Sequence, residues 1–215
     1  MQTKHHIEQE IKLTAPDQQT LDQVLNCKQV ALALIDKPPL ADSENFASTY
    51  YDTHDWALRK MKWSLRTRFE GERHVCTLKR NSTIIDGLSV CEEIEQTTKS
   101  GFKCVADIPA GKIADEMNTV FDASMILLPT ISVNMRRTKR ILKFNKTIVE
   151  LVTDAGEISA NNKSSALYEV ELELIQGDLL SKAVKLFIEH LTSHYALKHS
   201  TKSKHQIGLA HYNLP

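Results

Sequence analysis

The segment from His6 to Leu13 alternates charged and apolar residues along its length. Glu8, Glu10 and Lys12 occupy every second position, and mostly aliphatic residues stand between them. Because residues two apart on a β-strand point to the same face, the segment predicts a strand with two carboxylates and an ammonium on one side. An ordinary half-exposed strand with its charges in water would look the same, so the interpretation depends on whether the pattern recurs.

The pattern does recur, and eight strands are predicted along the chain. They cover residues 6–13, 48–52, 64–69, 74–79, 90–96, 131–139, 147–153 and 168–174. The acids on their charged faces are Glu8, Glu10, Glu93, Glu95, Asp154, Glu169, Glu171 and Glu173. The bases are Lys12, Arg66, Arg68, Lys79, Arg137 and Lys139, together with Lys202 and Lys204 in a short basic tail.

The opposite strand faces are largely apolar, and amphipathic helices are available to cover them. We expect these helices over residues 16–35, 107–121 and 178–191, the last burying Leu179, Ala183, Leu186, Phe187 and Leu191. A turn is expected at Ala155-Gly156, whereas the face on which Arg140 lies is left open. About eight antiparallel strands suffice to close a barrel, and closure removes the exposed edges. From the strand pattern alone, an open sheet that shows its charged face to solvent, in one large domain or two small ones, is the alternative. The fold that we expect is one α+β domain over residues 1–215, a closed eight-stranded antiparallel barrel with a charged interior and flanking helices.

Overall charge and cysteine usage narrow the class of protein. The 27 basic and 27 acidic residues cancel, so the basic excess expected of a nucleic-acid or membrane-surface protein is missing. The longest apolar runs fall far short of a membrane span. The four cysteines form no Cys-x-x-Cys pair, and no signal peptide is evident. We therefore expect free thiols in a reducing cytoplasm, and neither nucleic-acid nor membrane partners.

The charged residue types indicate one ligand chemistry if they converge inside a barrel. Clustered carboxylates are hard oxygen ligands that suit Mg²⁺ or Mn²⁺. Arginine contacts phosphate oxygens in pairs, and lysine acts as a point charge. Acid and base together indicate a metal–polyphosphate complex, whose metal would neutralise charge and help activate a water. The alternative is a lattice of salt bridges, but burying so many ions without a ligand would be costly.

The charged motifs follow one another in a characteristic order. They are Glu8-x-Glu10-x-Lys12, Tyr51-Asp52-Thr53, Leu65-Arg66-Thr-Arg68, Thr77-Leu78-Lys79, Glu93-x-Glu95, Arg137, Asp154-x-Gly156-x-Ile158, Glu169-x-Glu171-x-Glu173 and Lys202-Ser-Lys204. This ordered set resembles the CYTH, or triphosphate tunnel metalloenzyme, family over nearly the whole chain. The resemblance implies an eight-stranded antiparallel tunnel, divalent-metal dependence and triphosphate substrates. The Asp-x-Gly and Glu-Val-Glu-Leu-Glu-Leu segments are most similar to the bacterial inorganic triphosphatase branch.

The same resemblance implies roles for individual residues. The implied metal ligands are Glu8 and Glu10 with two of Glu169, Glu171 and Glu173. The implied phosphate contacts are Lys12, Arg66, Arg68, Lys79, Arg137, Lys139 and Lys202 or Lys204. Glu93, Glu95 and Asp154 would complete the polar lining of the tunnel. Lys12, which would also help position the attacking water, and Glu10 are the predicted catalytic residues.

Two positions depart from the family pattern. Cys91 stands where the family often has an arginine, and Ile207 stands where the tail often has one before a glycine. Either loss would weaken phosphate binding or alter the choice of substrate. Bacterial members often carry a further helical, histidine-rich domain that binds polyphosphate, which a longer native chain would place after residue 215.

The implied activity is metal-dependent hydrolysis of inorganic triphosphate to pyrophosphate and phosphate. A class IV adenylyl cyclase, a thiamine triphosphatase and a non-catalytic polyphosphate-binding module are the alternatives. His190 and His194 stand four apart on a predicted helix, but no third zinc ligand is evident. Trp56 and Trp63 flank the turn predicted before the arginine strand and are expected to pack against neighbouring residues, with stacking on a nucleobase as the minor alternative.

Overall fold

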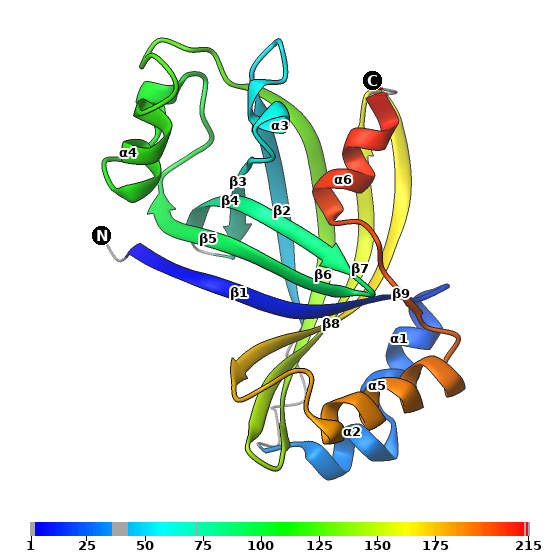
Figure 1. The fold of residues 1–215 in the computed structure, drawn as a ribbon. Coiled ribbons are helices and arrows are strands. Elements are labelled where there is room, and N and C mark those ends of the chain that lie inside the picture. The colour runs from blue at the N-terminus through cyan, green and yellow to red at the C-terminus, as the bar shows by residue number, and fades with distance from the viewer. Residues whose placement is uncertain (1–2, 36–42, 72, 213, 215) are drawn as a thin grey trace.

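The computed structural model describes residues 3–35, 43–71, 73–212 and 214. In these residues nine antiparallel strands form one sheet, and eight of them close into a barrel. Closure occurs because β1 (Thr3–Thr14) pairs with both β5 (Leu88–Thr98) and β8 (Lys163–Gln176). Between β5 and β8 the circuit runs through β4 (Arg73–Ile85), β3 (Ser64–Glu70), β2 (Ser43–Asp52), β6 (Leu128–Phe144) and β7 (Thr147–Ala160), as Figure 1 shows. The short β9 (Lys198–His199) joins β1 outside the circuit. The predicted closed eight-stranded antiparallel barrel is confirmed.

Alternation along the strands sorts side chains between the two sides of the barrel wall. On β1, Ile11 and Leu13 are buried in an apolar cluster on the outside, beneath α1 (Gln18–Leu25) and α5 (Lys182–His194). Glu10 and Lys12, which alternate with them, are buried on the inside. Burying one leucine contributes about 1.5–3 kcal/mol, so the outer apolar stripe determines which face turns inward.

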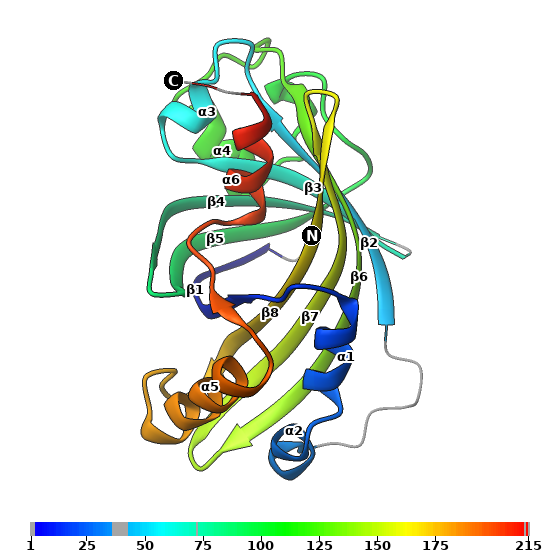
Figure 2. The ribbon, with the colours of Figure 1, turned by 90° about the vertical axis from the view of Figure 1, so that its right-hand side faces the viewer.

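Helices pack at both ends of the barrel (Figure 2). α1, α2 (Lys28–Ala33) and α5 gather at one end. At the other end lie α3 (Ala57–Lys60), α4 (Lys112–Asn118) and α6 (Lys204–Leu209), with the 3₁₀ turns η1 (Val105–Asp107) and η2 (Ala210–Tyr212). Around α6, Ile207 and Leu209 pack on an apolar cluster formed by β2, β6, β7 and β8, which includes Phe46 and Ile131. No helix in the described part of the chain is both long and apolar enough to cross a membrane.

The helix predicted over 16–35 is wrong as one continuous element. Its start is capped by Asp17, whose Oδ1 accepts a hydrogen bond from the Thr20 amide at 2.8 Å. It then breaks at Asn26, and Cys27 Sγ accepts from the Val30 amide to begin α2. The break follows from side-chain caps that compete with continued helical bonding.

Two other helix predictions need correction. The helix expected over 107–121 is reduced to α4, because Pro109 has no amide donor and Gly111 adopts φ 148°. In α5 the predicted buried stripe is wrong at Leu186, which is 55% exposed. Val184 turns toward the core in its place, and Phe187 and Leu191 are buried as predicted.

The turn predicted at Ala155-Gly156 is wrong, because β7 continues to Ala160. A side chain at position 156 would place Cβ 2.0 Å from the Asn134 carbonyl oxygen, so this glycine permits close approach of β6 rather than a turn. The actual turn lies at Asn161-Asn162, with φ values of 49° and 58°. Unbroken pairing of β6 with β7 also puts Arg140 on the face opposite Lys139.

Candidate active site

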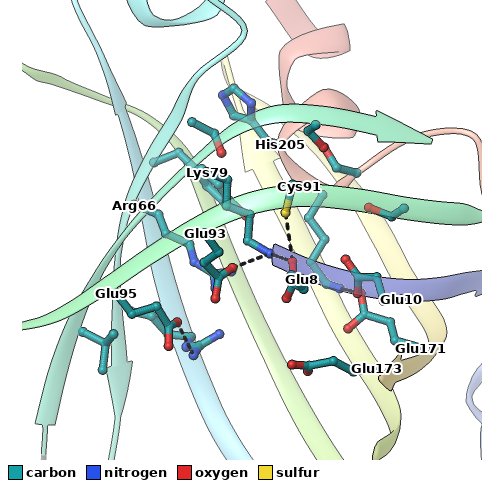
Figure 3. Close-up of a pocket in the computed structure, with 18 of the residues that line it drawn as sticks. Glu8, Glu10, Arg66, Lys79, Cys91, Glu93, Glu95, Glu171, Glu173 and His205 are labelled. Atoms are coloured by element: carbon teal, nitrogen blue, oxygen red, sulfur yellow. Dashed lines mark hydrogen bonds and ion pairs between the residues drawn. The ribbon is translucent and has the colours of Figure 1, made fainter. Parts of the chain in front are cut away.

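The barrel encloses a cavity of about 1250 Å³. Within the described residues, all eight barrel strands contribute side chains to its lining, and the start of α6 adds more. Glu8, Arg66, Lys79 and Glu171 come from four different strands and converge on this space (Figure 3). Charged groups that are far apart in the sequence therefore share one enclosed environment.

Most of the predicted site residues line this cavity. They are Glu8, Glu10, Lys12, Arg66, Arg68, Lys79, Glu93, Glu95, Arg137, Lys139, Glu171, Glu173 and Lys204. Asp154 and Glu169 are buried behind the lining, and Lys202 is exposed away from it. Of the two tail lysines left open by the sequence, the fold therefore brings Lys204 to the cavity.

Lys79 joins carboxylates from two neighbouring strands. Its Nζ contacts Glu8 and lies 2.6 Å from Glu93 Oε2 (Figure 3). Cys91 Sγ also donates to Glu8 Oε2 at 3.1 Å. Burial alone would raise the pKa of Glu8, but the ammonium of Lys79 holds that pKa down at about 2. Glu8 is therefore a carboxylate with its charge already balanced by the protein.

Glu10 and Glu173 have less compensation. They face each other across β1 and β8, and Glu173 faces Glu150 across β7, so three carboxylates form a row over three strands. Lys12 Nζ lies 2.9 Å from Glu10 Oε2 and 2.6 Å from Glu171 Oε1. The pKa of Glu10 is nevertheless raised, first by burial and also by Glu171 and Glu8. Carboxylates opposite one another repel, so this row attracts an additional cation.

Lys204 lies at the centre of a second group of acidic residues. Asp154, Glu169 and Glu171 place carboxylate oxygens within 4.8 Å of one another, and within the described residues this is the only such group of three or more potential metal ligands. Lys204 Nζ lies 2.9 Å from Asp154, 2.5 Å from Glu169 and 2.8 Å from Glu171. Arg137 adds a bidentate contact to Asp154, at 2.7 and 2.5 Å. The chain's own cations thus fill the centre of this group.

Three of the arginines that line the cavity, Arg66, Arg68 and Arg137, differ in how many ion pairs they make. Arg137 is held by Asp154, and Arg68 Nε donates to Glu70 Oε1 at 2.6 Å. Among the described residues, Arg66 makes no ion pair of this kind, and its buried Nε has no hydrogen-bond partner there. A buried guanidinium donor without an acceptor indicates a place for a bound oxygen ligand.

Comparison with known protein families decides the classification. The family model for the CYTH domain matches residues 6–206. The chain belongs to the CYTH domain family.

Known relatives of this CYTH domain agree with the assignment. It is 28% identical over 166 residues to the inorganic triphosphatase of Haemophilus influenzae, a match that covers 75% of this chain and 44% of the relative. The chain thus spans less than half the length of that relative. Among solved structures, it resembles the proposed adenylyl cyclase HpAC1 from Hippeastrum, described as revealing a dominant triphosphatase activity, with TM-score 0.67 and 19% identity over 94% of this chain and 95% of that one. A proposed adenylate cyclase from Bacillus halodurans gives TM-score 0.60 and 19% identity, covering 93% of this chain and 95% of that one. At this identity the two structures support the fold of the CYTH domain.

The CYTH domain also contains cavity residues that the sequence patterns missed. Phe46, Tyr50 and His205 line the cavity, and the rings of Tyr50 and His205 stack with centroids 5.1 Å apart. Burial lowers the pKa of His205 to about 4, so its imidazole is neutral at pH 7. The predicted strand over 48–52 began too late to include Phe46, which alternates onto the same face as Ser48 and Tyr50.

The structure of the CYTH domain also bears on the histidine pair and the two tryptophans considered in the sequence analysis. His190 and His194 stack on each other at 4.1 Å, and among the described residues they do not join a group of three metal ligands. Trp56 packs edge-on against Tyr212 at 4.7 Å. Trp63 lines the cavity with the Arg80 guanidinium over its ring. Packing thus accounts for Trp56, while Trp63 is accessible from the cavity.

Glu173 is expected to make the metal-free CYTH domain less stable as pH rises. Burial first, and then the charges of Glu8, Glu150 and Glu10, raise its pKa from 4.5 to about 7. Between these values the folded state holds a proton that the unfolded state has lost, so the free energy of unfolding falls as pH rises through that window. Removing the charge with Glu173→Gln should stabilise the protein by on the order of 2 kcal/mol at pH 8 and have no such effect at pH 4.

This expectation is measured by urea denaturation in EDTA at both pH values. Glu157→Gln, on the exposed outer face of β7, is the matched control and should change neither result. A Glu173→Gln protein with the same pH dependence as the parent would contradict it.

Proposed function

We propose that this CYTH domain hydrolyses inorganic triphosphate to pyrophosphate and phosphate with the help of Mg²⁺ or Mn²⁺. The observation that carries the proposal is the enclosed cavity, whose lining combines carboxylates, ammonium groups and guanidinium groups from separate strands. A polyphosphate bound with a divalent cation supplies both signs of charge that such a lining requires. The named activity of the Haemophilus relative supports the same reaction.

Phosphate recognition is assigned to the cavity cations that face open space. Arg66 contributes an unsatisfied Nε, and Arg68 and Arg137 present guanidinium groups nearby. Lys79 and Lys12 each contact two carboxylates and also line the cavity, and Lys139 lies 3.0 Å from Glu150. Arginines offer paired donors to phosphate oxygens, and lysines add positive charge.

The donor set fits a hard divalent cation. Glu10 and Glu173 have raised pKa values, first because they are buried and then because neighbouring carboxylates, Glu8 among them, repel their charge. Carboxylate oxygens are the ligands that Mg²⁺ and Mn²⁺ prefer. We assign Glu10 and Glu173 as the residues that hold the metal, with Glu8 and Glu171, which lysines of the chain already contact, beside them. Glu169 contacts Lys204 at 2.5 Å and is only 1% exposed, which leaves it as support for this set.

The reaction needs a water molecule held against the terminal phosphorus. When bound, the metal supplies charge neutralisation at the phosphoryl oxygens. The pKa of Lys12 is raised well above its usual value, because Glu10 and Glu171 outweigh the effect of burial, so its ammonium acts as a donor that orients the water. Glu10, with its raised pKa, accepts the proton. Attack by the water oxygen breaks the bridging P–O bond, and pyrophosphate leaves.

Phosphate-release assays test the proposal directly. Inorganic triphosphate, ATP and thiamine triphosphate are each incubated with Mg²⁺ or Mn²⁺, with EDTA as the control. Release from triphosphate that EDTA abolishes is the expected result. Formation of cyclic AMP from ATP would instead indicate a cyclase, and preference for thiamine triphosphate would change the assigned substrate. A folded protein that binds triphosphate without releasing phosphate would be a polyphosphate-binding module.

Arg66→Ala is expected to weaken substrate binding more than it slows turnover. A hydrogen bond to a charged group contributes about 1.5–3 kcal/mol, which corresponds to a rise in KM of roughly 10- to 100-fold. Steady-state kinetics with triphosphate measure the effect. Arg136→Ala is the matched control, because Arg136 is exposed on the outer face of β6. An unchanged KM in Arg66→Ala would remove this residue from the binding set.

A further inference from the structure

The Phe46 ring lies against two of the cavity arginines. The guanidinium carbon of Arg68 stands over the ring at 5.3 Å from its centroid, and that of Arg137 at 5.7 Å. Phe46 is 5% exposed and lines the cavity. A cation over an aromatic face within about 6 Å is attracted by the ring quadrupole, most strongly where water is excluded.

Strand register explains why one ring reaches both cations. On β2, Phe46 pairs with Glu70 of β3 on one side and with Met135 of β6 on the other. Arg68 and Arg137 each lie two residues along from those partners, on the same face of the sheet. Such diagonal neighbours are within reach of an aromatic side chain. Phe46 therefore lies between the two strands that carry these arginines.

The two guanidinium groups need such a spacer because they repel each other. The pKa of Arg68 is lowered by burial and by the positive charges of Arg66 and Arg137. Each arginine is tied to carboxylates of its own, Arg68 to Glu70 and Glu95, and Arg137 to Asp154 and Glu171. These four carboxylates lie on four different strands, and among the described residues none of them pairs with both arginines, so no shared carboxylate holds the two cations at a fixed distance.

The other surroundings of Phe46 hold the ring in place. It belongs to an apolar cluster with Tyr50, Val133 and Met135, against which α6 packs. The ring therefore marks the boundary between this apolar cluster and the charged cavity. A leucine at position 46 would retain apolar contact with the cluster, but it would present no aromatic face to the arginines.

We propose that Phe46 is a positioning residue that sets the spacing of Arg68 and Arg137 for a polyphosphate anion. The inference rests on the proposed function and deepens it. Phe46 itself does not contact the reacting atoms, and it acts through the two cations over its ring. Loss of the ring should therefore affect how tightly the anion binds more than how fast bound substrate reacts.

Three variants test the role of the ring. Phe46→Leu should raise the KM for inorganic triphosphate by about five- to tenfold, with kcat changed less than about twofold. Phe46→Tyr keeps the ring and should restore the parent KM. Phe187→Leu makes the same change in the core beneath α5, where Phe187 is 5% exposed and packs on Phe144. It should lower the melting temperature without raising KM.

Calorimetric titration with inorganic triphosphate in EDTA separates this inference from the proposed function. Weaker binding by Phe46→Leu than by the parent and Phe46→Tyr supports the positioning role, whether or not the parent turns over triphosphate. Equal binding and equal KM in folded Phe46→Leu and parent would overturn it while leaving the proposed function intact. A parent that neither binds nor hydrolyses triphosphate would overturn the proposed function, and the inference with it.

Discussion

Replacing Glu10 with alanine is expected to lower triphosphate turnover by roughly two to three orders of magnitude. Glu10 is 4% exposed, and its Oε2 lies 2.9 Å from Lys12 Nζ. The substitution removes both the assigned proton acceptor and one of the assigned metal ligands. Initial rates of phosphate release at saturating Mg²⁺ or Mn²⁺ measure the loss.

The same substitution should leave the fold intact. Glu10 is repelled by Glu171 and Glu8, so its removal relieves repulsion, and Lys12 keeps its 2.6 Å contact with Glu171. A thermal melt close to that of the parent is therefore expected. Glu157→Ala, on the outer face of the barrel, is the matched control and should retain full activity. Parent-like turnover in Glu10→Ala would remove Glu10 from the catalytic residues.

Lys204→Met is expected to lower the free energy of unfolding by about 3–5 kcal/mol, the usual cost of leaving buried charge uncompensated. Lys204 Nζ lies within 3 Å of three carboxylates, at 2.9 Å from Asp154, 2.5 Å from Glu169 and 2.8 Å from Glu171. Asp154 is 0% and Glu169 1% exposed, so water cannot replace the lost ammonium. Urea denaturation at pH 7 measures the change.

The pH dependence of that loss identifies its cause. Without Lys204, the pKa values of the buried acids should rise, so the folded variant takes up protons as pH falls and its deficit relative to the parent shrinks. Lys202→Met removes an exposed lysine two residues away and should have little effect. A Lys204→Met protein as stable as the parent at pH 7 would show that this acid group does not need the tail lysine.

Sequence patterns located the strands well because their alternation is strong. On β1 the period of two separates Glu10 and Lys12 from Ile11 and Leu13. Because the aliphatic face packs under the helices, the charged face of the strand must point into the barrel. Helices were predicted less well, since breaks at Asn26 and Gly111 depend on local capping and on a positive φ. The apolar stripe of α5 was misjudged at Leu186 because Val184, Phe187, Ile188 and Leu191 make up the buried face of the helix and leave Leu186 on the exposed side.

Some site residues had no signal at all in the sequence. In the sequence alone, Phe46 is an ordinary aromatic residue near a predicted strand, and His205 belongs to a short basic tail. Their importance comes from neighbours on other strands, such as Arg68 and Tyr50. Contacts with residues on other strands, which are distant along the chain, produce no periodic pattern within a single segment of the sequence.

The sequence by itself determined which side chains share a face, because the side-chain period of a β-strand is a local property. It also determined that these faces carry both acids and bases, and hence the kind of ligand they suit. Only the tertiary structure decided which charges meet. Barrel closure through β1 and β5 brings Glu8 to Lys79, and α6 carries Lys204 rather than Lys202 to the acids. Coulombic interactions depend on distance in space, and the fold alone sets that distance.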